Sequence, residues 1–132
     1  MSEGMLTWRQ RIDDARAEGL AAREYFVIFT KPKAGKEAVQ RHLAIHLEYQ
    51  RDLERRGIIV AAGPLSDEAG QEWTARGLIV IRADSLQAAR AIADADPMHR
   101  DGVRTYEIMP WLMNEASFTL KISLAAQTVE FA

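Results

Sequence analysis

Cysteine is absent from all 132 positions of the sequence. This absence excludes disulfide bonds, thiolate nucleophiles and zinc or iron–sulfur centres held by cysteine. Any chemistry that the protein performs must therefore use oxygen and nitrogen groups.

Long apolar runs are also missing. No stretch approaches the roughly 20 apolar residues that cross a bilayer, and charged side chains interrupt the N-terminal segment where a signal core would lie. We therefore expect a cytoplasmic protein without a membrane partner.

An excess of positive charge is missing as well. The formal net charge is -2, so the chain has no broad positive field that would neutralise phosphates, and a nucleic-acid partner is not expected. What remains is an ordinary globular composition, with 48% hydrophobic and 27% charged residues. A chain of this length fits one domain, which we assign to residues 1–132.

Hydrophobic periodicity predicts an α+β fold. The expected core strands span 24–31, 58–62, 77–81 and 103–109, and the expected helices between them span 36–56 and 85–95. Gly57 is expected to end the first of these helices, and Gly63-Pro64 to end the second strand. This order, βαββαβ, is the ferredoxin-like split βαβ arrangement with an antiparallel sheet. A helix near 6–18, with Thr7 and Gln10 as a capping box, and a strand over 117–124 flank it.

Several motifs carry a family likeness. A helical His46 lies eleven positions before Gly57, and the next strand ends in Ala62-Gly63-Pro64-Leu65. The second half adds Ala93-Asp94-Ala95-Asp96-Pro97, Gly102, Tyr106-Glu107-Ile108 and Pro110-Trp111. Over about 25–112 the chain thus resembles the YCII-related family, and the segments 1–23 and 113–132 are extensions beyond the family pattern.

The resemblance implies a ferredoxin-like fold assembled as a homodimer, in the group of dimeric α/β barrels that includes muconolactone isomerases and small cofactor-free quinone oxygenases. It implies no cofactor. It also implies an active-site cleft with a histidine and an aspartate, which map onto His46 and Asp96.

His46 has two interpretations. It falls on the apolar stripe of its helix, beside Leu43 and Leu47, so it is either a core histidine satisfied by one hydrogen bond or a general base kept neutral by partial burial. The family likeness favours the general base. Asp96 is either a turn residue before Pro97 or the group that orients the imidazole, and Asp94 is its nearby competitor.

Other candidates are weaker. Ser66, His99 and Arg100 are candidate substrate-binding residues, although His99 also fits a solvated loop. Arg100 and Arg104 could hold a substrate carboxylate, but the interpretation as ordinary surface arginines is preferred for both. His42 and His46 have the four-residue spacing of a zinc pair, but no third ligand is evident, so no metal site is predicted. The three tryptophans are interpreted as packing residues.

Two function classes follow. The first is a cofactor-independent lyase or isomerase that uses a His-Asp pair on a small organic acid or aromatic substrate. The second is a non-catalytic module that binds a small molecule or dimerises. In both, the apolar character of both faces of strands 24–31 and 77–81 predicts a homodimer or higher homo-oligomer.

Overall fold

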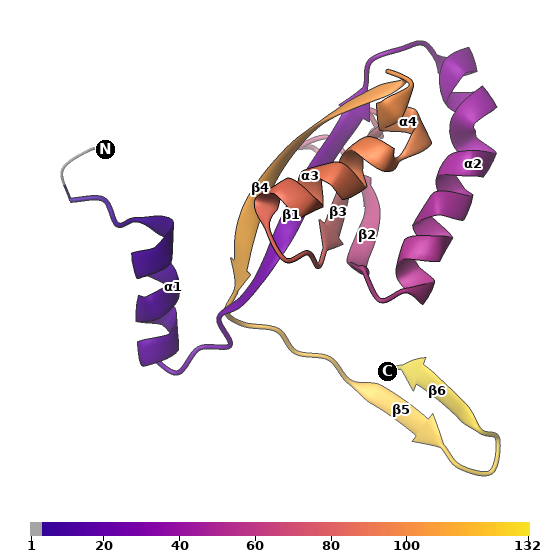
Figure 1. Cartoon of the computed structure of the whole chain (residues 1–132). Helices are drawn as coiled ribbons and strands as arrows, with labels where there is room; N and C mark the ends of the chain where they lie inside the picture. The colour runs from indigo at the N-terminus through magenta and orange to yellow at the C-terminus, as the bar shows by residue number, and fades with distance from the viewer. Residues whose placement is uncertain (1–3) are drawn as a thin grey trace. The chain divides into compact units, whose positions relative to one another are not determined.

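The structure is a computed structural model that describes residues 4–132 (Figure 1). It divides into two compact units, which are described separately. The larger unit is Glu24–Trp111, and the smaller unit combines the described residues up to Arg23 with Leu112–Ala132. Among residues 4–132, none of the helices has the length and apolarity that a bilayer crossing requires.

The larger unit has the predicted ferredoxin-like architecture. Its elements are β1 (Arg23–Pro32), α2 (Lys36–Arg55), β2 (Ile59–Leu65), β3 (Arg76–Ile81), α3 (Leu86–Ala95), α4 (Pro97–Arg100) and β4 (Arg104–Met113). The strands form one antiparallel sheet in the order β2-β3-β1-β4. The prediction of an α+β, βαββαβ fold is therefore confirmed.

The core lies between one face of this sheet and the helices α2 and α3 (Figure 1). The register pairs Phe26 with Ile81 and Ile28 with Ile79, so alternate side chains of β1 and β3 point towards the helices. Ala89 and Ala93 of α3 pack against them. Burying a large aliphatic side chain such as Ile81 contributes about 1.5–3 kcal/mol, which makes this layer the main source of stability.

The two element ends predicted from glycine and proline differ in outcome. Gly57 follows the end of α2 with φ +72°, in the left-handed region that glycine adopts most easily, as predicted. By contrast, β2 does not stop at Gly63-Pro64 but continues to Leu65. It is an edge strand, and an edge strand tolerates a proline because one row of its N–H groups has no partner strand.

The smaller unit contains α1 (Trp8–Ala17) and a hairpin of β5 (Leu120–Ser123) and β6 (Thr128–Phe131). Thr7 and Gln10 form the predicted capping box at the start of α1. The strand predicted over 117–124 is shorter, and its partner β6 was not predicted. The hairpin register places Leu120 opposite Phe131 and Ile122 opposite Val129, so the four apolar side chains share one face.

Candidate active site

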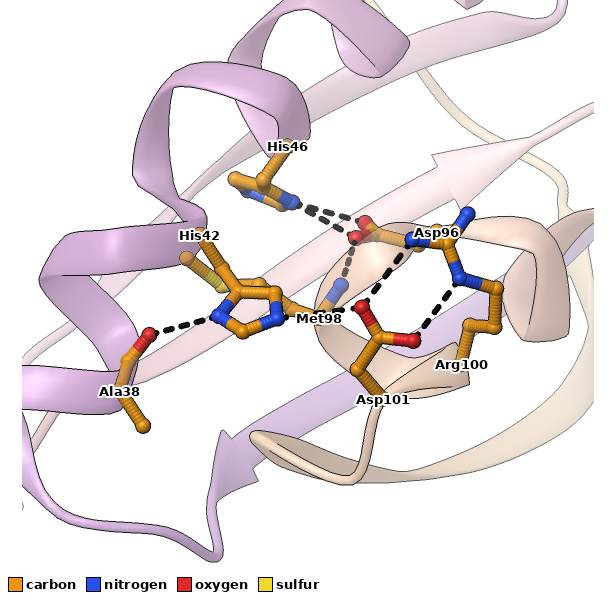
Figure 2. A network of polar contacts seen from close by, with 7 residues as sticks. All are labelled: Ala38, His42, His46, Asp96, Met98, Arg100 and Asp101. Atoms are coloured by element: carbon orange, nitrogen blue, oxygen red, sulfur yellow. Dashed lines mark hydrogen bonds and ion pairs between the residues drawn. The ribbon is translucent and has the colours of Figure 1, made fainter.

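His46 and Asp96 meet in the larger unit. The Nδ1 atom of His46, on α2, lies 2.9 Å from Oδ1 and 2.8 Å from Oδ2 of Asp96 (Figure 2). The side chains are 15% and 5% exposed, respectively, so this ion-pair geometry is largely shielded from water. Since a carboxylate only accepts hydrogen bonds, Nδ1 of His46 carries the hydrogen, and the lone pair of a neutral ring is on Nε2.

Asp96 is fixed by the helix junction on which it lies. It follows the last residue of α3 and is the N-cap of α4, where its Oδ1 accepts a hydrogen bond of 2.9 Å from the backbone N–H of Met98. Pro97 is the first residue of α4, a position that suits proline because the missing N–H needs no partner there. The carboxylate that faces His46 thus also caps a helix.

Nε2 of His46 faces different surroundings from Nδ1. Within residues 4–132, Nε2 has no hydrogen-bond partner, and His46 lines a cavity of about 310 Å³. Asp96 does not line this cavity. The arrangement is therefore layered, with the carboxylate behind the imidazole and the imidazole at the cavity wall. A base positioned in this way accepts a proton from a bound molecule while the carboxylate stabilises the resulting imidazolium.

A second pair lies one helical turn earlier and differs in its contacts. His42 places Nε2 3.1 Å from Oδ2 of Asp101 and Nδ1 2.8 Å from the carbonyl oxygen of Ala38 (Figure 2). Both partners are acceptors, so both contacts hold together only when both ring nitrogens carry hydrogen. Arg100 also binds Asp101 and is the main cause that lowers the pKa of this carboxyl to about 2. His42 does not line the cavity.

The cavity lies between α2 and the strands β2 and β3. Its lining is mostly apolar and includes the α2 side chains Val39, Leu43 and Leu47. Leu43 and Leu47 are substantially exposed. They belong to the apolar stripe of α2 that was expected to pack in the core, but at this point the stripe faces the cavity. Trp73, from the loop before β3, also lines it. A small apolar or aromatic molecule would fit this volume and these walls.

The polar end of the cavity is built from β1 and β4. Arg104 donates from Nε to the Thr30 hydroxyl at 3.0 Å, and that hydroxyl lies 2.8 Å from Nε2 of His99. Nδ1 of His99 lies 2.8 Å from the Ala93 carbonyl oxygen and donates to it, so Nε2 accepts from the Thr30 hydroxyl. Burial lowers the pKa of His99 below its usual 6.5, which agrees with this neutral form. Burial also lowers the pKa of Arg104.

Arg104 also holds the loop before β3. An Nη2–H group donates a short hydrogen bond to the carbonyl oxygen of Ala75, a non-glycine residue with φ +61°. Such a conformation is unfavourable for alanine and persists where the surroundings fix it. The neighbouring Trp73 donates from its indole nitrogen to the Arg76 carbonyl oxygen at 3.0 Å. These two bonds set the position of the indole at the cavity.

The remaining candidates from the sequence lie elsewhere. Ser66 donates to the Asp67 carbonyl oxygen and does not line the cavity, and neither do Arg100 or His99. His99 belongs to α4 and is half-buried, with both ring nitrogens in hydrogen bonds, so it is not a solvated loop residue. Asp94 accepts a hydrogen bond of 2.5 Å from Tyr106. Burial, and to a smaller extent this hydrogen bond, raises the pKa of Tyr106 to about 12. Asp96 is thus the carboxylate that contacts His46.

Sequence reasoning missed Thr30 at the cavity, and it preferred a surface position for Arg104 and a packing role for Trp73. Arg104 is buried rather than at the surface, Thr30 is buried beside it, and Trp73 is 63% exposed at the cavity rather than packed in a core. Strand alternation was the available signal, because residues an even number of positions apart point to the same face of a strand. Arg104 therefore points to the same side as the inward-facing Ile108, and Thr30 to the same side as Ile28.

The described residues, 4–132, contain no group of three or more His, Asp or Glu side chains arranged to hold a metal ion. His42 and His46, which the four-residue spacing placed on one helix face, bind two different carboxylates instead.

Comparison with known proteins places this fold in a family. The chain matches the YCII-related domain over residues 24–112. The uncharacterized protein YjpA of Bacillus subtilis (strain 168) is 34% identical over 76 residues, which are 58% of this chain and 82% of YjpA.

Among solved structures, TftG of Burkholderia phenoliruptrix AC1100 is a 5-chloro-2-hydroxyhydroquinone dehydrochlorinase in complex with 2,5-dihydroxybenzoquinone. TftG is 20% identical, with a TM-score of 0.53, and the match covers 66% of this chain and 92% of TftG. At that identity the structural likeness shows the fold. The domain match spans more than half of the chain, and the chain therefore belongs to the YCII-related family.

Proposed function

We propose that this protein is a cofactor-independent enzyme of the lyase or isomerase type, which moves a proton on a small organic acid or aromatic substrate. His46 is the base and Asp96 its orienting carboxylate. One observation carries the proposal: Nδ1 of His46 lies within 2.9 Å of both oxygens of a buried Asp96, while His46 lines the cavity.

The geometry supplies what such a reaction needs. Nδ1–H of His46 donates to Asp96, which fixes the tautomer and leaves the Nε2 lone pair for a proton of the substrate. Removal of that proton from a carbon next to a carbonyl group leaves an enolate, and the imidazolium forms beside the Asp96 charge. Return of the proton to another atom of the substrate completes an isomerisation, and departure of an anionic leaving group completes an elimination.

Two further observations support the substrate class. The cavity of about 310 Å³ is at the lower end of volumes that hold small organic ligands, and its walls are apolar. The structural relative TftG is named as a dehydrochlorinase of a chlorinated hydroxyhydroquinone, which is an elimination on a small oxygenated ring. This likeness supports the choice of test compounds.

The test does not require the natural substrate. Hydroxylated aromatic acids, lactone acids and halogenated hydroquinones are incubated with the enzyme in D₂O, and C–H exchange and halide release are followed by nuclear magnetic resonance and ion chromatography. We expect His46→Gln to lower the exchange rate by about 10²–10⁴-fold, the usual contribution of positioned proton transfer. Asp96→Asn is the second variant because the amide oxygen still accepts from Met98 and preserves the cap of α4.

His42→Gln is the matched control. His42 is on the same helix and also contacts an aspartate, but it does not line the cavity, so exchange should stay at the wild-type rate. Full exchange activity in folded His46→Gln protein would reject the base. Binding of these compounds without exchange by the wild type would instead favour the alternative, a non-catalytic binding module.

A further inference from the structure

The charge of the cavity lining has a consequence for the ligand. Among the described residues, 4–132, the ionisable side chains that line the cavity are Arg76, Arg104 and His46. None of the described lining residues is Asp or Glu. An apolar cavity with two cations and no carboxylate favours an anion that has an apolar body.

Arg104 is the stronger of the two cations as a ligand-binding group. It is only 9% exposed, and within residues 4–132 it forms no ion pair. Its contacts use Nε–H, to the Thr30 hydroxyl, and one Nη2–H, to the Ala75 carbonyl oxygen. A guanidinium has five N–H groups, so three remain without a partner among the described residues. A buried, unpaired charge is costly unless an anion neutralises it.

The surroundings hold the guanidinium in place before a ligand arrives. Thr30 fixes Nε from β1, and Ala75 fixes Nη2 from the loop before β3, so the plane of the group is set from two sides. Asp96 is near enough to favour the charge of Arg104 but is not in contact with it, and it is already held by His46. The free side of the fork is therefore suited to a planar oxygen group, which arginine binds with paired hydrogen bonds.

We infer, from these contacts and on the basis of the proposed function, that the substrate is an anion with a flat apolar body, and that Arg104 binds its anionic oxygen group. Arg76, exposed at the same cavity, adds a second positive charge, and the Trp73 indole contacts the apolar body. The anionic group is a carboxylate or an ionised phenol, because each carries negative charge on oxygen that lies in the plane of an attached ring.

Ligand binding by the full chain tests this inference without turnover. Benzoate, its neutral isostere benzamide and 4-nitrophenolate are titrated by calorimetry, and Trp73→Phe identifies the fluorescence change on benzoate binding that comes from the cavity. We expect benzoate to bind about tenfold or more tightly than benzamide, because a charge-assisted hydrogen bond is lost with the charge. Arg104→Gln should weaken benzoate by a similar factor and leave benzamide unchanged.

The comparison of the two anions identifies the oxygen group, since the one that binds more tightly marks the substrate as an acid or a phenol. Arg41→Gln is the control, because Arg41 is an exposed arginine of α2 outside the cavity, and it should leave all affinities unchanged. If Arg104→Gln does not fold, Arg104→Lys and Arg76→Gln take its place, and each should weaken benzoate but not benzamide.

Any of three results would overturn the inference. The first is equal affinity for benzoate and benzamide, and the second is no binding of either anion at millimolar concentration. The third is a benzoate affinity that these arginine variants leave unchanged. The outcome is separate from that of the exchange assay. If anion binding depends on the arginines but His46→Gln exchanges at the normal rate, the proposed base is rejected and the anion site is kept. If exchange requires His46 but the protein shows no preference for anions, the anion site is rejected and the proposed base is kept.

Discussion

At the scale of single residues, three histidines of one family-like region differ in what their ring nitrogens contact. His42 faces two acceptors, His46 faces one carboxylate and the cavity, and His99 donates to one carbonyl and accepts from Thr30. In all three rings Nδ1 donates a hydrogen bond, so the rings differ in what Nε2 faces: Asp101 in His42, no protein partner among residues 4–132 in His46, and the Thr30 hydroxyl in His99. Only His46 combines an orienting carboxylate with access to the cavity.

His99 predicts a pH dependence of stability. Burial lowers its pKa below 6.5, so the unfolded chain binds a proton more readily than the folded chain in the range from pH 6.5 down to the folded pKa. The contribution of His99 is fully present above pH 6.5 and is lost as the pH falls through that range, with a slope of at most about 1.4 kcal/mol per pH unit. Urea unfolding of wild type and His99→Gln at about pH 5.5 and 7.5 measures it.

The variant should show a smaller loss of unfolding free energy on acidification than the wild type. Because the carboxylates titrate in both proteins, the difference between the two isolates His99. An identical pH dependence in the two proteins would show that His99 is not held in its neutral form.

Part of the candidate site was predictable at this scale. The apolar stripe of the helix and the family likeness identified His46 and Asp96, but their contact joins residues fifty positions apart and follows from the fold. Arg104 was considered as a binder of a substrate carboxylate but was ranked as a surface arginine, because its burial depends on partners from β1 and the loop before β3. Local sequence does not contain such long-range partners.

At the scale of elements, the predicted order of strands and helices is confirmed, because periods of two and 3.6 residues are properties of the local sequence. The four-residue α4 and the four-residue β6 were missed. Four residues cover about one helical turn or two strand repeats, which is too short for a periodic pattern to be recognised. Pro64 misled the prediction for β2, because a strand on the edge of the sheet was not distinguishable in advance from a central one.

Gly57 allows a clean test of a helix end. Its φ is +72°, and a Cβ added there would meet no atom within 4 Å, so Gly57→Ala introduces backbone strain without a clash. We expect a loss of about 1 kcal/mol in the free energy of unfolding, measured by urea denaturation with an unchanged m-value. Gly63→Ala, which also has open space but no positive φ, should show no such loss. Equal effects of the two substitutions would contradict the conformational explanation.

At the scale of the whole molecule, the sheet face opposite α2 and α3 remains rich in apolar side chains. Phe29, Leu65, Met109 and Trp111 are each between 36% and 45% exposed, and they belong to β1, β2 and β4. A cluster of exposed apolar side chains across one sheet is typical of a protein–protein interface. The homodimer expected from the sequence and from the family likeness stays a prediction, and this face is where we expect it to form.

Substitution on this face tests the dimer. We expect wild-type protein to scatter light as a dimer at micromolar concentration and Met109→Glu to scatter as a monomer, because a buried unpaired carboxylate opposes association. Ile45→Glu is the matched control, since Ile45 on α2 is 44% exposed and Met109 is 45% exposed. A monomeric wild type, or a dimer that survives Met109→Glu, would remove this face as the interface.

The double use of Asp96 has a consequence for observation. One oxygen of the carboxylate that orients His46 also accepts the backbone N–H of Met98, so the charge and position of that carboxylate act directly on one amide proton. The nitrogen–proton resonance of Met98 is therefore an internal reporter of the pair. Its frequency should move when a proton or a ligand reaches His46, so that occupancy of the site becomes visible in a spectrum before any product has been identified.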